Sequence, residues 1–148
     1  MDMARTVMAF GTFDTLHYGH VSYLNAAKRY GDRLVVIIAR DKSVELMKHR
    51  KPIFDERTRL RMVRALKPVD EAVLGNKLSK ASDRYAIIKR YRPAVIVLGY
   101  DQVGSTKPIE KWLKENGLRT KVMKLNRGVD VDIFKSSAIR KRLLRSAT

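Results

Sequence analysis

Short apolar runs alternate along the chain with longer stretches in which apolar residues recur at helical spacing. The runs are rich in aliphatic residues and cover residues 6–10, 33–39, 71–75, 94–99 and 120–125. Runs of this kind predict β-strands. Two of them, 33–39 and 94–99, are almost continuously apolar, which is typical of central parallel strands covered by helices on both faces. The pattern therefore predicts an α/β fold with a doubly wound parallel sheet.

The stretches between the runs predict the helices that connect the strands. We expect helices at residues 19–30, 55–67, 84–91, 108–116 and 137–145. Gly31 is expected to stop the first of these helices and Asp55 to begin the second. Trp112 lies in the fourth helix, where we expect it to pack rather than to bind a ligand. No linker, internal repeat or low-complexity tract interrupts the alternation, so we expect a single domain over residues 1–148.

Composition narrows the classes of protein that the chain can belong to. Of its 148 residues, 45% are hydrophobic, which is enough for a sizeable core. No apolar run approaches the roughly 20 residues needed to span a bilayer, and the first ten residues do not resemble a signal peptide. We therefore expect a cytoplasmic protein without a membrane segment. The absence of cysteine excludes disulfides, thiolate zinc sites and a cysteine nucleophile.

The charge balance indicates an anionic partner. The chain has 32 Lys and Arg against 15 Asp and Glu, for a formal net charge of +17. Such a charge raises the local concentration of nucleotides or nucleic acid. The cations are spread along the chain, and no zinc finger or RNA-binding aromatic signature accompanies them. Nucleic acid is therefore not expected to be the main ligand.

The motif "GTFDTLHYGH", residues 11–20, places His17 and His20 between the first strand and the first helix. Open α/β sheets bind ligands at the carboxyl ends of their strands, where this turn is expected. Three-residue spacing brings both rings to one face of the helix. The pair is compatible with a metal site, with local packing, or with phosphate binding at a helix N-terminus, where Gly19 would let a phosphate approach.

The same residues carry a family resemblance. The combination of "GTFD" and "HYGH" after a strand resembles the HxGH-type nucleotidyltransferase superfamily, which has a Rossmann-like fold. Further segments, "IARDKSV" (38–44), "RKPIFDERTRLRMVRALKPVDEAVLG" (50–75) and "VIVLGYDQ" (95–102), resemble its archaeal FAD synthase branch. The resemblance extends over residues 6–145 and implies an enzyme that transfers AMP from ATP to FMN.

The resemblance also implies roles for individual residues. His17, His20, Lys51 and Arg59 correspond to residues that contact the reacting phosphates, with Lys48 and Arg57 as neighbours that could exchange roles with them. The residues that correspond to the family's nucleotide-binding positions are Thr12, Phe13, His17, Tyr18, Gly19, His20, Asp101, Arg127, Gly128, Ser136 and Ser137. For Phe13 a role as a core residue is equally compatible with the sequence, and Asp14 is expected to fix a loop or a metal rather than to act as a base.

The resemblance leaves three functions to compare. The first is FMN adenylylation, with Mg²⁺ as the expected divalent cation, held mainly by phosphate oxygens. The second is cytidylyl transfer to a small phosphorylated alcohol such as glycerol 3-phosphate. The third is a non-catalytic protein that binds nucleotide or nucleic acid. Few protein ligands to this cation are expected, and no dedicated metal-binding residues are assigned. Relatives of this kind suggest a homodimer.

Overall fold

The expected strands form one parallel sheet in which the first strand is central. The computed structural model describes residues 4–99, 105–125 and 136–146. Its strands are β1 (Thr6–Gly11), β2 (Arg33–Ile38), β3 (Glu71–Leu74), β4 (Val95–Leu98) and β5 (Lys121–Lys124). They pair in the order β3-β2-β1-β4-β5, and every pair is parallel. The predicted doubly wound sheet is confirmed, and the two most apolar runs, β2 and β4, flank β1 in its interior.

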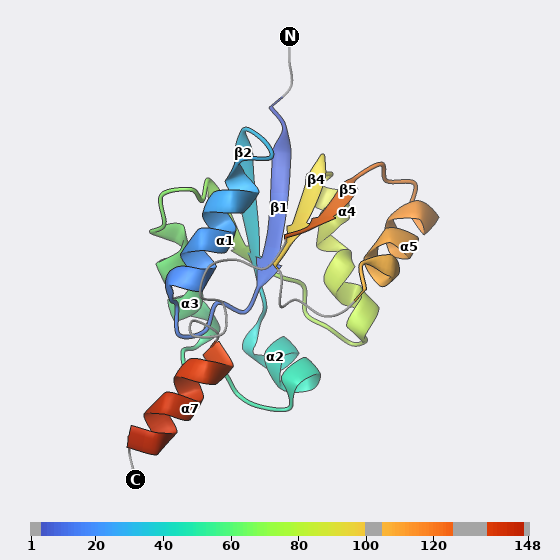
Figure 1. Ribbon diagram of the computed structural model, residues 1–148. Coiled ribbons are helices and arrows are strands. Elements are labelled where there is room, and N and C mark those ends of the chain that lie inside the picture. The colour runs from blue at the N-terminus through green and yellow to red at the C-terminus, as the bar shows by residue number, and fades with distance from the viewer. Residues whose placement is uncertain (1–3, 100–104, 126–135, 147–148) are drawn as a thin grey trace.

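Successive strand residues point to opposite faces of the sheet and build two core layers. Helices α1 (Tyr18–Lys28) and α3 (Glu56–Arg64) cover one face, and α4 (Ile87–Tyr91) and α5 (Lys107–Glu115) cover the other (Figure 1). The first layer is formed by buried residues that include Val7, Ala9, Leu24, Val36, Val63 and Val97. The second is formed by buried residues that include Met8, Val35, Ile88, Ile96 and Leu113. Trp112 packs against the second layer, as expected.

The strand order fixes where a ligand is expected. From β1 the chain moves outward to β2 and β3, then returns to the other side of β1 as β4. The pairing of β1 with β4 ends at Ala9 and Val97, and beyond it the two strands lead into loops on the same edge of the sheet. In open parallel sheets this switch point, at the carboxyl edge, is where ligands bind.

Two details of the helices differ from the predictions. Helix α1 ends at Lys28, before Gly31, and no left-handed residue stops it there. Gly31 instead lies against the start of β1, where an added Cβ would come within 2.5 Å of the Arg5 carbonyl oxygen. The helix predicted at 84–91 is divided into a 3-10 helix, η1 (Ala81–Tyr85), and α4.

Helix α2 (Asp41–Lys48) was not predicted, although it lies directly below the carboxyl edge of the sheet in Figure 1. It is short, its N-cap residue Arg40 makes no side-chain capping bond, and it ends at His49 in the left-handed conformation rather than at a glycine. Bonds from another helix hold its start instead, because the Asp41 N–H donates to Glu56 Oε1 at 3.0 Å. The usual local signals for helix ends are therefore missing from its sequence.

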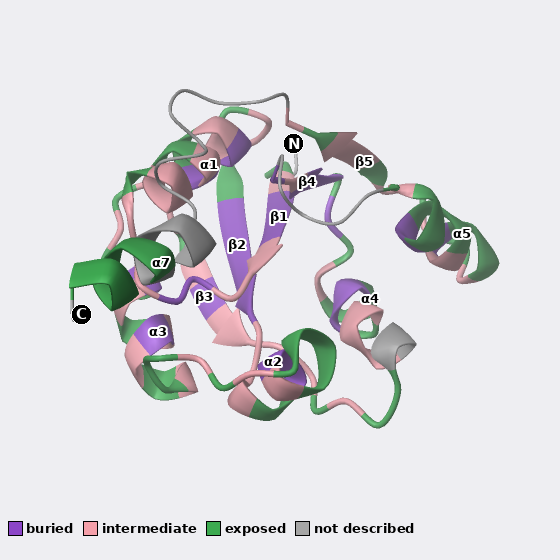
Figure 2. Cartoon of the chain, turned by 60° about the horizontal axis from the view of Figure 1, so that its bottom comes forward, coloured by how far each residue is buried: buried purple, intermediate pink, exposed green. Residues whose placement is uncertain are grey.

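The last described helix, α7 (Ser136–Ser146), agrees with the prediction at 137–145. Its residues 141–146 are exposed and it projects from the body of the protein (Figures 1 and 2). No helix in the described part of the chain is long and apolar enough to cross a membrane.

Candidate active site

The turn between β1 and α1 forms the centre of the candidate site. Gly11 ends β1, and the chain then passes through Phe13 and Thr15, which both have positive φ, at 55° and 49°. Non-glycine residues rarely adopt this conformation, and such strain is concentrated at functional sites. The Phe13 ring folds back over Gly11, and a Cβ added to Gly11 would lie 2.7 Å from this ring. Phe13 is only 2% exposed. The glycine of the "GTFD" motif therefore makes room for the phenylalanine ring.

The side chain of Phe13 packs in the core. Its ring stacks on Tyr23 with centroids 6.4 Å apart and meets His20 edge-on at 5.4 Å. Of the two roles compatible with the sequence, the buried ring supports the core role. Contact with a nucleotide could then come only from its backbone.

His17 and His20 are joined by two reciprocal hydrogen bonds. His17 is the N-cap of α1, and its Nδ1 accepts from the Gly19 N–H at 3.1 Å. His20 Nδ1 accepts from the His17 N–H at 3.2 Å. This is a capping box in which imidazoles replace the usual hydroxyl and carboxylate. The two rings stack with centroids 3.8 Å apart.

The capping box determines where the imidazole protons are. A neutral imidazole that accepts at Nδ1 carries its proton on Nε2, so both rings become Nε2–H donors. Burial lowers the pKa of His20 to about 3, the neighbouring His17 and Lys48 also lower this pKa, and Asp14 raises it. His20 is therefore neutral at physiological pH and can donate a hydrogen bond without carrying a charge.

The backbone donors of the first turn are already used. The Gly19 N–H bonds to His17 Nδ1, and the His20 N–H bonds to the His17 carbonyl oxygen at 3.0 Å. A phosphate at this end of α1 would thus meet imidazole N–H groups before these backbone groups. Gly19 contributes a bond that orients His17 in addition to the open approach expected from the sequence.

Asp14 fixes the segment that precedes α3. Its carboxylate is 4% exposed and accepts from the backbone N–H groups of Ile53 and Phe54 at 2.7 and 3.0 Å. Of the roles expected for Asp14, the structure shows the loop-fixing one. Both carboxylate oxygens are engaged, and no group of three potential metal-ligating side chains occurs among the described residues.

Arg59 differs from the expectation that it contacts a phosphate. Its side chain is completely buried, at 0% exposure, and donates to the carbonyl oxygens of Thr12, Ala39 and Phe54 and to Asp41 Oδ1. These bonds are 2.7 to 3.0 Å long. The guanidinium connects the β1–α1 turn, the end of β2, α2 and the segment before α3. The direct phosphate contact is therefore corrected to a positioning role.

Lys48 brings a positive charge to the turn. Lys48, at the end of α2, donates from Nζ to Thr12 Oγ1 at 3.0 Å. Lys51 lies in the following segment with an exposed side chain. The sequence indicated Lys48 only as a substitute for its neighbours, whereas the structure brings it to the turn.

Tyr23 is a residue of the site that the sequence analysis did not identify. Its hydroxyl donates to the Val97 carbonyl oxygen at 2.6 Å and lies 3.5 Å from that of Phe10. It thus joins the ends of β4 and β1 where the two strands part. Its position three residues after His20, on the same face of the helix, was the signal that could have revealed it.

The remaining predicted residues are not tested by the structure. Asp101, Arg127 and Gly128 lie outside the described residues. Ser136 and Ser137 are the first two residues of α7, and their side chains are not described.

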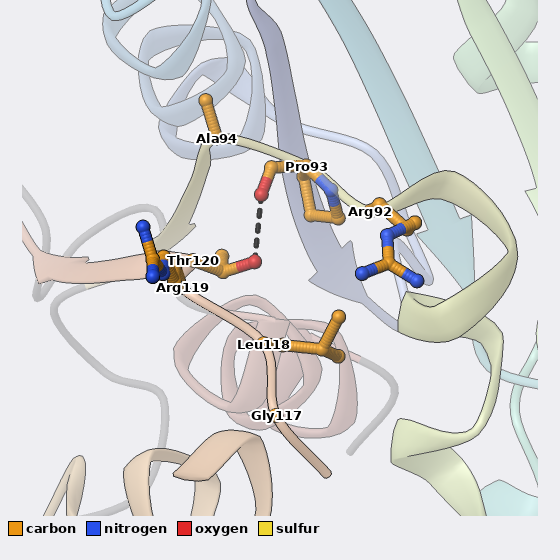
Figure 3. Close-up of a pocket in the computed structure, with 7 residues that line it drawn as sticks. All are labelled: Arg92, Pro93, Ala94, Gly117, Leu118, Arg119 and Thr120. Atoms are coloured by element: carbon orange, nitrogen blue, oxygen red, sulfur yellow. Dashed lines mark hydrogen bonds between the residues drawn. The ribbon is translucent and has the colours of Figure 1, made fainter.

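A separate hollow lies at the opposite edge of the sheet. It is lined by Arg92, Pro93, Ala94, Gly117, Leu118, Arg119 and Thr120, at the amino ends of β4 and β5 (Figure 3). Thr120 closes one side by donating to the Pro93 carbonyl oxygen at 2.6 Å. Ligands of parallel sheets bind at the carboxyl edge, and the strained turn and histidine pair are also there. We therefore assign the candidate active site to that edge.

The buried position of Arg59 predicts that lysine cannot replace it. Lysine keeps the charge but cannot donate to four separated acceptors, so Arg59→Lys should lower the free energy of unfolding by about 2–4 kcal/mol. Arg57→Lys, at an exposed position of the same helix, should change it by less than about 0.5 kcal/mol. Urea unfolding measures both, and equal stability of the two variants would contradict the role of Arg59.

The low pKa of His20 predicts a specific loss of stability in acid. Because folding lowers this pKa from its ordinary value of 6.5 to about 3, unfolded chains bind more protons between these values. The contribution of His20 to the free energy of unfolding is fully present above the pKa of the unfolded chain. It is lost as the pH decreases toward the pKa of the folded protein. His20→Gln keeps an acceptor for the capping box but does not titrate, so its stability should fall less between about pH 7 and about pH 4.5. Parallel pH curves for the wild type and the variant would contradict this.

Comparisons with known proteins agree with the fold and the motif. Residues 8–142 match the family model described as cytidylyltransferase-like. The chain is 49% identical to a protein of Aciduliprofundum boonei named FAD synthase, over 86% of this chain and 82% of the relative. It is 42% identical to a Methanohalophilus mahii protein with the same name, over 93% of each.

Solved structures show the same architecture. A lipopolysaccharide core biosynthesis protein from Thermoplasma volcanium superposes with a TM-score of 0.77 at 35% identity, over 85% of this chain and 99% of that one. Thermotoga maritima TmcAL, bound with alpha-thio ATP, gives a TM-score of 0.69 at 10% identity, over 97% of this chain and 51% of that one, and supports the fold alone. With the family model covering nearly the whole chain, this protein belongs to the cytidylyltransferase-like family.

Proposed function

We propose that this protein transfers AMP from ATP to FMN and produces FAD and pyrophosphate. The observation that carries the proposal is the pair of stacked imidazoles held through their Nδ1 atoms at the start of α1, of which His20 is neutral. The similarity to archaeal proteins named FAD synthase supports FMN as the acceptor and ATP as the donor.

In the proposed reaction an oxygen of the FMN phosphate attacks the α-phosphorus of ATP. The new phosphorus–oxygen bond forms as the bond to the pyrophosphate oxygen breaks, and that electron pair leaves with pyrophosphate. The attacking phosphate is largely deprotonated at neutral pH, so no general base is needed. Catalysis then consists of aligning two anions and stabilising the charge on the phosphoryl oxygens.

The residues at the carboxyl edge suit these two tasks. His17 and His20 donate from Nε2 to phosphoryl oxygens, and because His20 is neutral it acts as a dipole rather than as a charge. Lys48 and Lys51 supply positive charge that attracts the triphosphate. Thr12 and the backbone of Phe13 would lie beside the bound triphosphate. Asp14 and Arg59 hold this arrangement without contacting the substrate.

Other residues are included in the proposal because they match positions of the family that the sequence resembles. Tyr18 and Gly19 begin α1 next to His17 and flank the bound phosphates. Asp101 would bind the ribose or the base of the nucleotide, and Arg127, Gly128, Ser136 and Ser137 would enclose its β- and γ-phosphates.

The proposal includes a divalent cation such as Mg²⁺, which would bind together with the triphosphate. With both Asp14 oxygens engaged and no three-ligand cluster among the described side chains, phosphate oxygens and water would supply its ligands. When bound, it would neutralise phosphate charge. A cytoplasmic location and a homodimer likewise stay predictions.

Loss of one imidazole donor gives the sharpest prediction for the reaction. His20→Ala should lower the rate of AMP transfer by about 100- to 1000-fold, the usual effect of removing a donor to transition-state charge. FAD formation from ATP and FMN with Mg²⁺ is followed by chromatography, and pyrophosphate release is measured in parallel. Near-wild-type turnover by a folded His20→Ala protein would contradict the role.

The same assay with CTP and glycerol 3-phosphate separates the alternatives. Pyrophosphate release only with that pair would overturn FMN adenylylation in favour of cytidylyl transfer. No turnover with either pair, together with salt-sensitive RNA binding, would instead support the non-catalytic binding protein.

A further inference from the structure

Large exposed hydrophobic side chains are concentrated around the candidate site. In the described part of the chain they are Tyr18, Leu46, Met47, Ile53, Phe54, Leu143 and Leu144. The last two belong to α7, and all the others lie on α1, α2 or the segment before α3, which form or contact the β1–α1 turn. In a chain with 32% charged residues, such a concentration marks a binding surface.

The bonds made by Asp14 place two of these side chains next to the turn. Asp14 accepts from the backbone N–H groups of Ile53 and Phe54, so these two residues are held beside the β1–α1 turn. Arg59 holds the Phe54 carbonyl oxygen from the interior. The side chains themselves stay 51% and 39% exposed. The protein thus uses a buried carboxylate and a buried guanidinium to hold a segment whose apolar side chains remain in water.

Met47 borders the same place from α2. It follows the buried residues Ser43 and Val44 by four and three positions, so it shares their side of the helix, which faces the body of the protein. The next residue, Lys48, reaches Thr12 in the turn. Leu46 is three positions after Ser43 but two after Val44, so it lies at the margin of this side, and Met47 lies between the two buried residues. We call Met47, Ile53 and Phe54 the apolar rim.

The rim combines apolar surface with adjacent cations. Lys48 and Lys51 lie in the same segments, and the imidazole pair lies across the turn. A ligand that fits must carry a phosphate at one end and a large apolar group at the other. Glycerol 3-phosphate has the phosphate but no apolar group, whereas FMN has a phosphate and a flat three-ring system joined by a flexible chain.

We propose that the apolar rim binds the isoalloxazine ring of FMN and so selects the acceptor. This proposal rests on the proposed function and extends it to a specificity surface. One face of the ring would cover Met47, Ile53 and Phe54, and removal of both surfaces from water would stabilise the complex. The phosphate of FMN would extend to the lysines and the imidazole pair. The switch point between β1 and β4 then remains for ATP.

Two exposed positions allow a test that leaves the fold intact. Met47→Ser and Ile53→Ser should each raise the KM for FMN by about fivefold, since each removes a few apolar groups from contact with the ring. The KM for ATP should stay within about twofold, because ATP contacts other residues. Riboflavin, which has the ring without the phosphate, should inhibit the wild type in competition with FMN and inhibit both variants less.

Leu144→Ser is the matched control, because Leu144 is 70% exposed and lies on α7. It should leave both KM values and riboflavin inhibition unchanged. Circular dichroism verifies that all three variants are folded, and sedimentation gives their oligomeric state.

The outcomes separate this proposal from the proposed function. If the wild type forms FAD but Met47→Ser and Ile53→Ser keep the wild-type KM for FMN, the rim does not bind the flavin and FMN adenylylation stands. If the wild type forms no FAD, the proposed function itself fails. If either variant converts a dimer to monomers, the rim is a contact between two copies of the chain, and its assignment to flavin is overturned.

Discussion

The site depends on the two hydrogen bonds that His17 and His20 exchange with the start of α1. A helix leaves its first N–H groups without partners, and here imidazole nitrogens accept two backbone N–H bonds at this end. The same bonds fix the ring orientation and, because Nδ1 of each ring accepts, place a proton of each ring on Nε2. Local helix capping and the chemistry of the site are therefore one interaction, and the motif needs both histidines at three-residue spacing because each supplies half of the box.

The turn that carries this pair is strained and is supported from several directions. Phe13 and Thr15 have positive φ, and the buried Phe13 ring, the Asp14 carboxylate and the Arg59 guanidinium hold the turn against the neighbouring segments. Arg59 and Asp14 are ionisable groups that the family resemblance placed near phosphates or a metal. In the structure both side chains lie behind the turn, where their charged groups bind and position backbone segments.

Much of this arrangement was predictable from the sequence, and the rest depended on contacts between distant residues. The five strands and their parallel arrangement follow from apolar runs that need burial on both faces, and the histidine turn follows from its place after the first run. Helix α2 was missed because Glu56 and Arg59, from another helix, hold its start. For Arg59 itself, sequence cannot distinguish a buried guanidinium from a phosphate ligand. The role of Tyr23 depended on a contact with Val97, 74 residues away.

The central claim is that His17 and His20 both accept at Nδ1, carry a proton on Nε2 and donate it to the triphosphate. Nuclear magnetic resonance of the ring nitrogens of the ¹⁵N-labelled protein at neutral pH reports protonation at each nitrogen directly. The account predicts protonated Nε2 and unprotonated Nδ1 in both His17 and His20, and a shift of both Nε2 signals when a non-hydrolysable ATP analogue is added. Protonation at Nδ1 in the free protein, or ring signals that do not respond to the analogue, would contradict it.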